Sequence, residues 1–597
     1  MLLFSTVAAL VPAAGPYSYA GIAGWLASIV AVLCLTSAAT SSLAWSAVPA
    51  QLWQRLRAAG RDRALLALVA ILLLALVLRL VALSSVPALF YGDEGEMGAN
   101  ALAIVRGQPD APWFFGIGFA ELPSLHFYLE ALSIQVFGVT LFALRFVSAL
   151  WGTFGVFAVY LAGSTLANRR VGILAALIAA AAPVDLQLSR LSLSNVETAV
   201  LATCTFAAFA AGLHRLTAEQ PEELLQRFWL SGAPFCFALA GVACALSLYF
   251  YVGSRVIPIA LAALCMDAVL RYRRRRRWFA GCAAVTLVAW LITFLPMLLF
   301  YVQHPHTADM GRAGTYFVLY HLHDAEQRFH VGNVAAVLAI QFRDAISQFF
   351  TQPDGSTFFS FGAPILLAPV AGLFVGGLLF VSLTLRRPAS VILAVWFWFT
   401  LLSGGVLNLD QPYTPRIVAL LPAVYLLAAL SLDWFLATAT LVLGAAAQRV
   451  LVPVTVLLLS AITISSIHDY FGVYFRNDPN PQVTAIANFI GSLPSGTYIY
   501  DLADGLYFAY GPNRYLGYRI AGEDLADPPQ QVPALTPKSR AIAFIVFPKW
   551  ATLLPEIEQR FPGGQVRPLL GYHNEVLVTT YTVSTVSNLS TAALPRR

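Results

Sequence analysis

Residues 64–90 read ALLALVAILLLALVLRLVALSSVPALF, and residues 91–98 directly after them read YGDEGEMG. The first stretch is apolar over more than the roughly 20 residues that an α-helix needs to cross the hydrocarbon core of a bilayer. Three carboxylates, Asp93, Glu94 and Glu96, follow it at once. This junction predicts a transmembrane helix that delivers acidic side chains to a membrane surface.

The composition extends this prediction to most of the chain. Of the 597 residues, 59% are hydrophobic and only 11% are charged, whereas soluble domains carry about 25% charged residues. A chain so poor in charge cannot cover a water-exposed surface of its own size. The net charge of +6 does not indicate nucleic-acid binding, because the cations lie in short clusters between apolar segments. The six cysteines lie in apolar runs without metal-ligand spacing.

Eleven or twelve apolar segments are long enough to cross a membrane as helices. The predicted spans are 20–46, 64–90, 142–167, 171–189, 194–213, 228–251, 255–270, 278–301, 362–385, 389–407, 416–442 and 450–467. Arginine clusters fall at alternate ends of these segments, and the densest is RYRRRRR at 271–277. Because such clusters stay on the cytoplasmic side, the loops 91–141 and 302–361 and the chain after about 468 are predicted to be extracytoplasmic.

Composition divides the chain into three predicted parts. Residues 1–63 hold an additional helix and a basic cytoplasmic loop, and residues 64–468 form the membrane domain. Within the outer loop, residues 95–106 have helical spacing and residues 121–138 are apolar but interrupted by polar side chains. Both are predicted to be helices that lie along the outer interface.

Residues 469–597 are predicted to form a small α/β domain. The runs TYIYDL and AIAFIVF are typical of buried strands, LLPEIEQRF has helical spacing, and VLVTTYTV is typical of a terminal strand. The predicted fold class is therefore mostly α: a polytopic helical membrane bundle followed by a small C-terminal α/β domain outside the membrane.

The carboxylates after residue 92 admit two interpretations. Asp93 and Glu94 could cap the N-terminus of the helix predicted at 95–106, where the helix dipole favours anions. A carboxylate at this place could equally be a general base for a hydroxyl acceptor, which requires only a partly desolvated site. Glu96 is predicted to be a solvated helix residue.

A second constellation consists of arginines at the outer ends of predicted helices. Arg145, Arg190, Arg255 and Arg416 each start or finish a span on the side where the positive-inside rule expects few cations. A single such arginine is explained by a side chain that reaches toward the headgroups. Four of them indicate a shared anionic ligand, and phosphate fits because a guanidinium binds it bidentately.

The stretch from about 85 to 215 resembles the GT-C superfamily of membrane glycosyltransferases, in particular the protein-mannosyltransferase and aminoarabinose-transferase branch. Asp93-Glu94-Gly95 resembles the Asp-Glu that opens the first extracytoplasmic loop of those enzymes. ELPSLHFYL at 121–129 is similar to their EKPPL(Y/H)FWL stretch. The segment 143–178 resembles their RLPSAL…VYLLARRL…GRRAGLLAALI stretch, and the segment 415–432 resembles their late (R)YLLPALPALALL helix.

The chain departs from that pattern at three positions. Leu122 stands where the family has a lysine, and Ser124 stands where it has a second proline. Asn195 replaces a carboxylate that often follows Arg190 in the family, with Glu197 two residues later. A lysine that helps to hold donor phosphate would therefore need another cation in its place, and the donor sugar could differ.

The resemblance implies a multi-pass enzyme of a bacterial plasma membrane. The implied reaction is inverting transfer of a sugar from a polyprenyl-phosphate-linked donor to an extracytoplasmic acceptor hydroxyl on protein, lipid or glycan. It implies Asp93 as general base and Glu94 as a residue that orients the acceptor or the base. The implied phosphate ligands are Arg145, Arg416, Arg190 and Arg255. The implied acceptor or sugar ligands are Glu121, His126, Asn195 and Glu197.

No metal site or firm cofactor is predicted, although histidines between 304 and 330 could bind a divalent cation. A transporter or lipid flippase is the alternative from another class, and it would show paired ionisable residues at mid-membrane, broken helices or two similar halves. Asp185, Asp267 and Asp433 lie near predicted helix ends, and the two halves of the sequence do not look alike. A structural or interaction protein is the third option.

Overall fold

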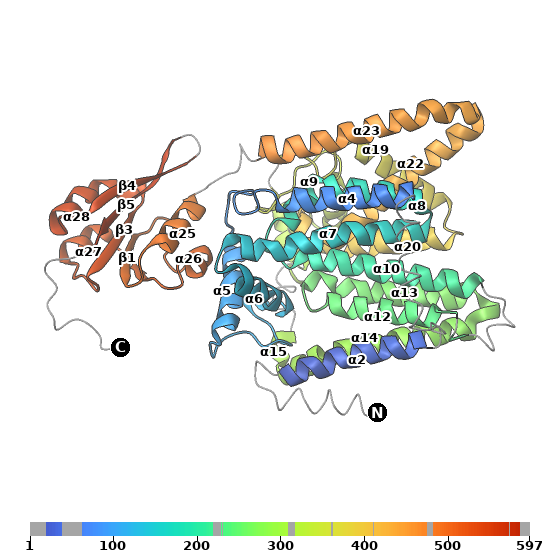
Figure 1. Cartoon of the computed structure of the whole chain (residues 1–597), viewed down its shortest axis with the longest axis horizontal. Helices are drawn as coiled ribbons and strands as arrows, with labels where there is room; N and C mark the ends of the chain where they lie inside the picture. Colours follow the sequence, from blue (N-terminus) through green and yellow to red (C-terminus); the bar gives the residue numbers. More distant parts are fainter. Residues whose placement is uncertain are drawn as a thin grey trace.

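The computed structural model describes residues 19–38, 62–218, 228–229, 231–308, 317–359, 362–409, 411–474, 482–571 and 574–584. Figure 1 shows most of the helices running side by side in one bundle, with a small sheet domain beyond one end of it. The predicted basic loop of the N-terminal region, residues 39–61, lies outside the described residues.

Each of the twelve predicted spans contains a helix. These helices are α2 (Tyr19–Ala38), α4 (Arg63–Leu80), α7 (Leu141–Leu166), α8 (Arg169–Ala181) with α9 (Pro183–Ser189), α10 (Asn195–Ala218), α12 (Ala233–Ser247), α13 (Val256–Arg271), α14 (Arg276–Gln303), α19 (Ala368–Leu383), α20 (Pro388–Thr400), α22 (Leu421–Leu443) and α23 (Gln448–His468). Among the described residues, eight helices are long and apolar enough to cross a membrane, and a bent pair would make a ninth. Three further apolar helices are shorter. The predicted fold class, a polytopic helical bundle, is confirmed.

Two predicted spans end or bend earlier than expected. The span predicted at 64–90 ends at Leu80, and the chain then runs irregularly to α5. The span predicted at 171–189 is broken into α8 and α9, which meet at an angle of 63°. The break coincides with Pro183, which lacks the N–H needed to continue the α8 hydrogen-bond ladder. Arg79 of α4 donates to the carbonyls of Ala179 and Ala180 at the broken end.

The first outer loop forms two helices at the end of the bundle, α5 (Gly92–Arg106) and α6 (Leu125–Phe137). Figure 1 shows α5 across the bundle end, between the membrane helices and the sheet domain. The helix begins three residues before the predicted 95–106, so that Asp93 and Glu94 lie within its first turn. The second outer loop contains α15 (Pro305–Ala308), α17 (Leu322–Phe329) and α18 (Val334–Ser347).

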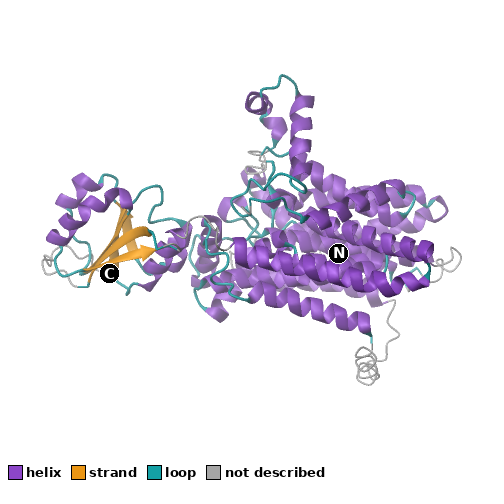
Figure 2. Ribbon diagram, turned by 90° about the horizontal axis from the view of Figure 1, so that it is seen from above, coloured by secondary structure: helices purple, strands orange, loops and turns teal. Residues whose placement is uncertain are grey.

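The C-terminal domain contains a five-stranded sheet in the order β2-β1-β3-β5-β4. Its strands are β1 (Thr497–Leu502), β2 (Ala521–Asp524), β3 (Ala541–Val546), β4 (Gln565–Leu570) and β5 (Val576–Val583), and its helices are α25 (Gln482–Ser492), α26 (Gly511–Leu516), α27 (Pro528–Ala534) and α28 (Leu554–Arg560). β1, β2 and β3 are parallel, whereas β5 pairs antiparallel with both β3 and β4. The orange strands in Figure 2 lie well away from the bundle, and helices lie between the sheet and the bundle.

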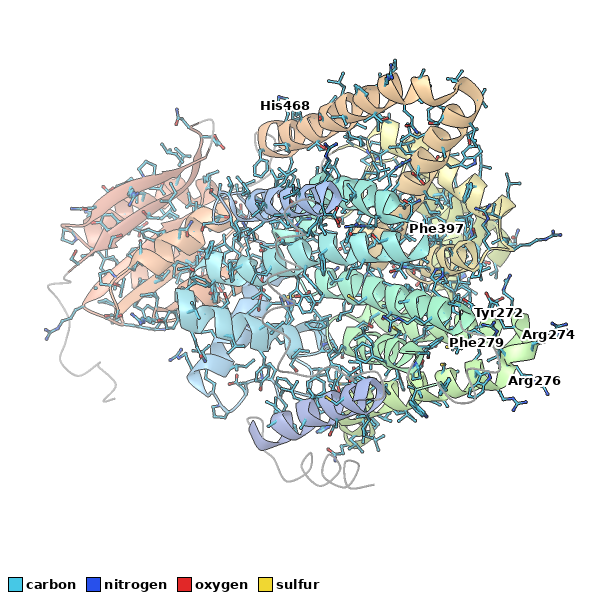
Figure 3. All side chains as sticks on the ribbon, turned by 45° about the vertical axis from the view of Figure 1, so that its right-hand side comes forward. Tyr272, Arg274, Arg276, Phe279, Phe397 and His468 are labelled. Carbon is cyan, nitrogen blue, oxygen red and sulfur yellow. The ribbon has the colours of Figure 1, made fainter. Side chains whose placement is uncertain are left out.

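The densest arginine cluster of the sequence lies at one end of the bundle. Figure 3 shows Arg274 and Arg276, from the densest arginine cluster, at the end opposite to the C-terminal domain. The helices α5 and α6 lie at the same end as the sheet. The 271–277 cluster and the C-terminal domain therefore lie at opposite ends of the bundle.

Candidate active site

A pocket is formed where α5 meets the nearby ends of the membrane helices, and it encloses about 670 Å3 with the open solvent at its mouth included. It is lined by Asp93, Met97, Ala120, Glu121, Leu122, Leu193, Asn195, Tyr251, Val252, Arg255, Thr307, Phe358, Tyr413, Pro415 and Arg416. Five of the ten predicted site residues are thus brought together, although they come from four separate parts of the chain.

Asp93 reaches the pocket from the first turn of α5. Its side chain is half-buried, and Met97, one turn later on the same face of the helix, lines the same pocket. The N-terminal end of the α5 dipole favours the ionised carboxylate at this position. The two interpretations of Asp93 are therefore compatible, since the residue lies in the first helical turn and also faces a cavity.

Glu94 points away from the pocket and is completely buried. Its two carboxylate oxygens each accept a hydrogen bond from Arg145, from Nε and Nη2, at 2.9 Å. The backbone N–H groups of Tyr91 and Ser192 also donate to it, at 3.1 and 2.9 Å. Glu94 therefore joins α5 to α7 and to the segment before α10, and no face of it is left for an acceptor.

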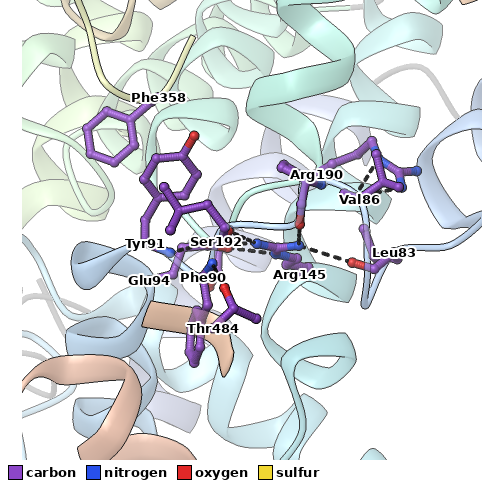
Figure 4. Close-up of polar contacts among 12 residues, drawn as sticks. Leu83, Val86, Phe90, Tyr91, Glu94, Arg145, Arg190, Ser192, Phe358 and Thr484 are labelled. Carbon is purple, nitrogen blue, oxygen red and sulfur yellow. Dashed lines mark hydrogen bonds and ion pairs between the residues drawn. The ribbon is translucent and has the colours of Figure 1, made fainter. Parts of the chain in front are cut away.

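Arg145 is also completely buried, and Figure 4 shows it between Glu94 and the carbonyl of Leu83. Its two terminal nitrogens donate to the carbonyls of Leu83, Pro87 and Leu89 at 3.3, 2.7 and 2.7 Å. With Glu94 these acceptors occupy the guanidinium, so Arg145 has no donor directed at the pocket. Its phosphate role, expected from the sequence, has no geometric support here.

Arg190 has the same kind of environment as Arg145. It is buried, and it donates to the carbonyls of Leu78, Val81 and Val86 at 2.6, 2.7 and 2.8 Å. These carbonyls belong to the end of α4 and to the irregular segment that follows it. Backbone groups at the end of a membrane helix must be satisfied internally, and Arg145 and Arg190 do this for the connection between α4 and α5.

Arg416 and Arg255 are the two arginines that line the pocket. Nη1 of Arg416 donates to the hydroxyl of Tyr251 at 3.0 Å, and its guanidinium lies over the ring of Tyr413, 5.3 Å from the centroid. Arg255 ends a 3-10 turn (Val252–Arg255) at the start of α13 and lies beside the hydroxyl of Tyr301. Two half-buried guanidinium groups on one cavity suit a phosphate.

The backbone around Arg416 is fixed by side chains from other parts of the chain. Asp354 accepts a hydrogen bond from the N–H of Thr414 at 3.0 Å, and the amide of Asn195 donates to the carbonyl of Pro415 at 3.2 Å. Asn195, which stands in place of a carboxylate, thus lines the pocket and holds one of its walls. An asparagine can donate this hydrogen bond, whereas a carboxylate cannot.

The loop that carries Glu121 has an uncommon backbone. Ala120 and Glu121 both have a φ of +57°, a left-handed conformation that residues with a Cβ adopt at a cost of roughly 1–3 kcal/mol. The loop is closed by hydrogen bonds from Gly118 N–H to the Leu122 carbonyl and from Ser124 N–H to the Gly116 carbonyl, at 2.9 and 3.1 Å. This conformation places Glu121 at the pocket, with its side chain exposed.

His126 and Glu197 lie behind the pocket in a buried polar cluster. His126 Nδ1 lies 2.9 Å from Glu197 and its Nε2 lies 3.1 Å from Glu130, and all three side chains are fully buried. The hydroxyl of Ser192 donates to Glu130, and the N–H of the same serine donates to Glu94. Ser192 therefore connects this cluster to the Glu94–Arg145 pair. The cluster supports the pocket walls from behind and does not line the pocket.

Two solved structures share this architecture. ArnT from Cupriavidus metallidurans bound to undecaprenyl phosphate aligns with a TM-score of 0.51 and 16% identity, over 88% of this chain and 99% of that one. The archaeal oligosaccharyltransferase AglB from Archaeoglobus fulgidus, in complex with an inhibitory peptide and a dolichol-phosphate, aligns with a TM-score of 0.50 and 14% identity, over 90% of this chain and 75% of that one. This chain has the GT-C fold. No family model and no curated protein matches its sequence.

The resemblance to GT-C enzymes in the sequence is thereby confirmed at the level of the fold. Among the described residues, no three His, Cys, Asp or Glu side chains come together as a metal site. His304, from the second outer loop, stacks on Phe300 with ring centroids 4.5 Å apart. Asp309 and Arg312 of that loop lie outside the described residues.

Several pocket residues had no signal in the sequence. Tyr251, Phe358 and Tyr413 are aromatic residues among the forty phenylalanines and 23 tyrosines of an apolar chain, and nothing local distinguishes them. Their role depends on contacts far away in the sequence, as between the rings of Tyr91 and Phe358 at 5.2 Å. Glu96 was expected to be solvated, but it is half-buried and pairs with Arg514 of the C-terminal domain at 2.8 Å.

Proposed function

We propose that this protein is an inverting glycosyltransferase that moves a sugar from a polyprenyl-phosphate-linked donor to an extracytoplasmic acceptor hydroxyl. The observation that carries the proposal is the shared pocket of Asp93 with Arg255 and Arg416. A carboxylate can accept the proton of the attacking hydroxyl. Two guanidinium groups can stabilise the phosphate that leaves.

The proposed reaction is a single displacement. The acceptor oxygen attacks the anomeric carbon while its proton passes to the carboxylate of Asp93. The bond between the anomeric carbon and the phosphate oxygen breaks, and its electron pair leaves with the polyprenyl phosphate. Arg255 and Arg416 bind the charge that develops on that phosphate. Attack from the side opposite to the leaving group inverts the configuration at the anomeric carbon.

The comparisons support the class of donor. The ArnT structure contains bound undecaprenyl phosphate, and the AglB structure contains a dolichol-phosphate. Both proteins have the fold of this chain. A donor anchored in the bilayer would present its phosphate at the membrane surface, where the pocket lies beside α5. The proposed sugar is a hexose or a pentose, and the proposed acceptor is a hydroxyl group of a protein, lipid or glycan.

The remaining predicted site residues take different roles in this proposal. Glu121 and Asn195 line the pocket and are proposed as sugar or acceptor contacts. Glu94, expected from the sequence to orient the acceptor or the base, is proposed instead as a positioning residue for Asp93. His126 and Glu197 are proposed to support the pocket from behind.

The pocket and the C-terminal domain are proposed to lie on the extracytoplasmic side. The support is the location of Arg274 and Arg276 at the opposite end of the bundle (Figure 3), because basic clusters stay in the cytoplasm. Single cysteines at exposed Lys549 and at Arg274, in a background without native cysteines, should react differently with an impermeant maleimide on intact cells. Labelling at 274 but not at 549 would invert the topology and overturn this proposal.

The decisive experiment uses the purified full-length protein in detergent with a panel of undecaprenyl-phosphate sugars. Release of undecaprenyl phosphate that depends on enzyme and acceptor is the expected result, measured with and without EDTA to detect a requirement for divalent cations. An extract of envelope lipids and glycans serves as the source of acceptor. The proposed sugar transfer would be refuted if the protein bound undecaprenyl phosphate but released none from any donor. Lipid binding would then be the only activity supported.

The alternative of a transporter or flippase has one feature in its favour, the broken pair α8–α9 with the buried Arg79 beside it. Arg79, however, donates to the carbonyls at the break, which accounts for its burial without a transported ion. Translocation of a fluorescent undecaprenyl-phosphate analogue in proteoliposomes, unaffected by Asp93→Asn, would favour this alternative. Transferase activity lost in the same variant would exclude it.

A further inference from the structure

The C-terminal domain contacts α5 through a row of glycines. Gly92, Gly95 and Gly98 are three residues apart in the sequence GDEGEMG and face α26 of the C-terminal domain. A Cβ added at any of them would lie less than 3.0 Å from an atom of Tyr510, Pro512 or Tyr515. The reverse also holds, because a Cβ at Gly511 would lie less than 3.0 Å from the backbone of α5. Only glycine allows two backbones to approach this closely.

Polar contacts fix the same interface on both sides of the glycine row. Arg514 pairs with Glu96 at 2.8 Å. The hydroxyl of Thr484 accepts a hydrogen bond from the N–H of Phe90 at 2.7 Å and donates to the carbonyl of Ala88 at 2.8 Å. These contacts extend from the segment that precedes α5 to its second turn. The helix that carries Asp93 is thus held by the membrane domain on one side and by the C-terminal domain on the other.

Tyr510 lies where this interface approaches Asp93. The backbone N–H of Gly92 donates to the hydroxyl oxygen of Tyr510, which satisfies one of the free N–H groups at the start of α5. Burial raises the pKa of Tyr510, and the carboxylate of Asp93 raises it further. The hydroxyl therefore keeps its proton at neutral pH, and Asp93 is the acidic group that follows Gly92 directly.

We propose that Tyr510, supplied by the C-terminal domain, positions Asp93 by donating its hydroxyl hydrogen to that carboxylate. The inference rests on the proposed role of Asp93 as general base. Held in this way, the carboxylate keeps one orientation toward the pocket and stays ionised to a lower pH, since a donated hydrogen bond favours the charged form. The docking of α26 onto the glycine row sets the position of Tyr510, so the C-terminal domain completes the site.

The test compares Tyr510→Phe with Tyr518→Phe, a matched change in the same domain, and follows undecaprenyl phosphate release against pH. Charged groups near Asp93 include Glu96 on its own helix, Arg514 of the C-terminal domain, and Glu121, Arg255 and Arg416 around the pocket, and both variants leave them unchanged. Tyr510→Phe should lower kcat roughly tenfold without changing the KM for donor, as expected for a lost hydrogen bond to a charged group. Its low-pH limb should move to higher pH by about half to one unit. Tyr518→Phe should follow the wild type.

A second pair of variants tests the same inference without changing Tyr510. Gly95→Ala would push Pro512 and Gly511 away from α5, and it should reproduce the shift of the low-pH limb. Gly372→Ala, in α19 with open space around the added methyl group, is the control and should be neutral. Wild-type kcat and an unmoved limb in both Tyr510→Phe and Gly95→Ala would overturn the inference. If Asp93→Asn also kept wild-type turnover, the proposed role of Asp93 as general base would be refuted as well. If only Asp93→Asn lost turnover, Asp93 would remain the proposed base and the role of Tyr510 would be refuted.

Discussion

Arg145 donates two parallel hydrogen bonds to Glu94, from Nε to Oε1 and from Nη2 to Oε2, and both are 2.9 Å long. Both side chains are fully buried, so neither ion is screened by water. A buried pair of this kind is strongly destabilised when one partner is removed, because the other charge remains without compensation. The pair joins α5 to α7, and through this connection it fixes the helix that carries Asp93.

Removal of one partner should therefore lower the stability of the fold more than it lowers the affinity for the donor. We expect Arg145→Ala to lower the free energy of unfolding by about 3–5 kcal/mol, measured by thermal unfolding of the protein in detergent. The affinity of the folded fraction for undecaprenyl phosphate should be within about twofold of the wild type. A stable Arg145→Ala protein that has lost donor affinity would instead restore Arg145 as a phosphate ligand.

The exchange Asp93→Asn separates catalysis from a purely structural role of this carboxylate in the first turn of α5. The N-cap of α5 is Tyr91, and Asp93 is the second residue of the helix, so asparagine removes only a favourable charge at the helix N-terminus of about 0.3–1 kcal/mol. Asparagine also cannot accept the acceptor proton. We expect a folded protein with unchanged donor affinity and a turnover reduced at least a hundredfold, the lower end of the range for general-base assistance of about 10²–10⁴. Asp110→Asn, in the exposed part of the same outer loop, is the control. Wild-type turnover in Asp93→Asn would show that this residue only stabilises the first turn of α5.

The two arginines of the pocket should behave differently from the two buried ones. Arg416→Ala and Arg255→Ala should each weaken binding of undecaprenyl phosphate by about 2–5 kcal/mol, as expected for a charge-assisted contact to phosphate. Lysine at either position should restore only part of the affinity, because the planar fork is lost. The dissociation constant for undecaprenyl phosphate is the measurement. The control is Arg343→Ala, which changes an exposed arginine of α18. Full affinity in both alanine variants would move the phosphate site elsewhere.

The buried cluster around His126 predicts a dependence of stability on pH. Burial alone lowers the pKa of His126, but the carboxylates of Glu197 and Glu130 outweigh it and raise the pKa from 6.5 to about 10. A raised pKa means that the stabilisation is complete below about pH 6.5 and is lost as the pH rises through about 10. The Tm of the wild type should therefore fall between about pH 8 and pH 10, and it should fall less in His126→Gln. Equal slopes for the two proteins would contradict this assignment.

Much of the fold could be predicted because hydropathy is a local property of the sequence. A run such as 64–80 is apolar enough to require a lipid or protein environment wherever it lies, and each predicted span does contain a helix. The strands β1, β3 and β5 were predictable for the same reason, since their residues are largely buried. β2 and β4 are mostly exposed and gave no apolar run.

The candidate site was predictable only in part, and the arginines show why. Arg145, Arg190, Arg255 and Arg416 all lie at the outer ends of helices in the sequence. Two of them are occupied by the carbonyls of the connection between α4 and α5, which lies more than 50 residues away from Arg145 in sequence. The other two face a cavity. Which carbonyls an arginine meets depends on the packing of remote segments, and no local pattern records it.

The sequence by itself determined that this chain forms a helical membrane bundle and that acidic residues follow the apolar run at 64–80, since these are consequences of transfer energies and charge along the chain. The tertiary structure decided which of those charged residues face a pocket and which neutralise one another. It also decided that Gly92, Gly95 and Gly98 receive the C-terminal domain. The physical reason is that a buried ion is costly unless it is paired and hydrogen-bonded, and the partners of Arg145 come from a part of the chain more than 50 residues away.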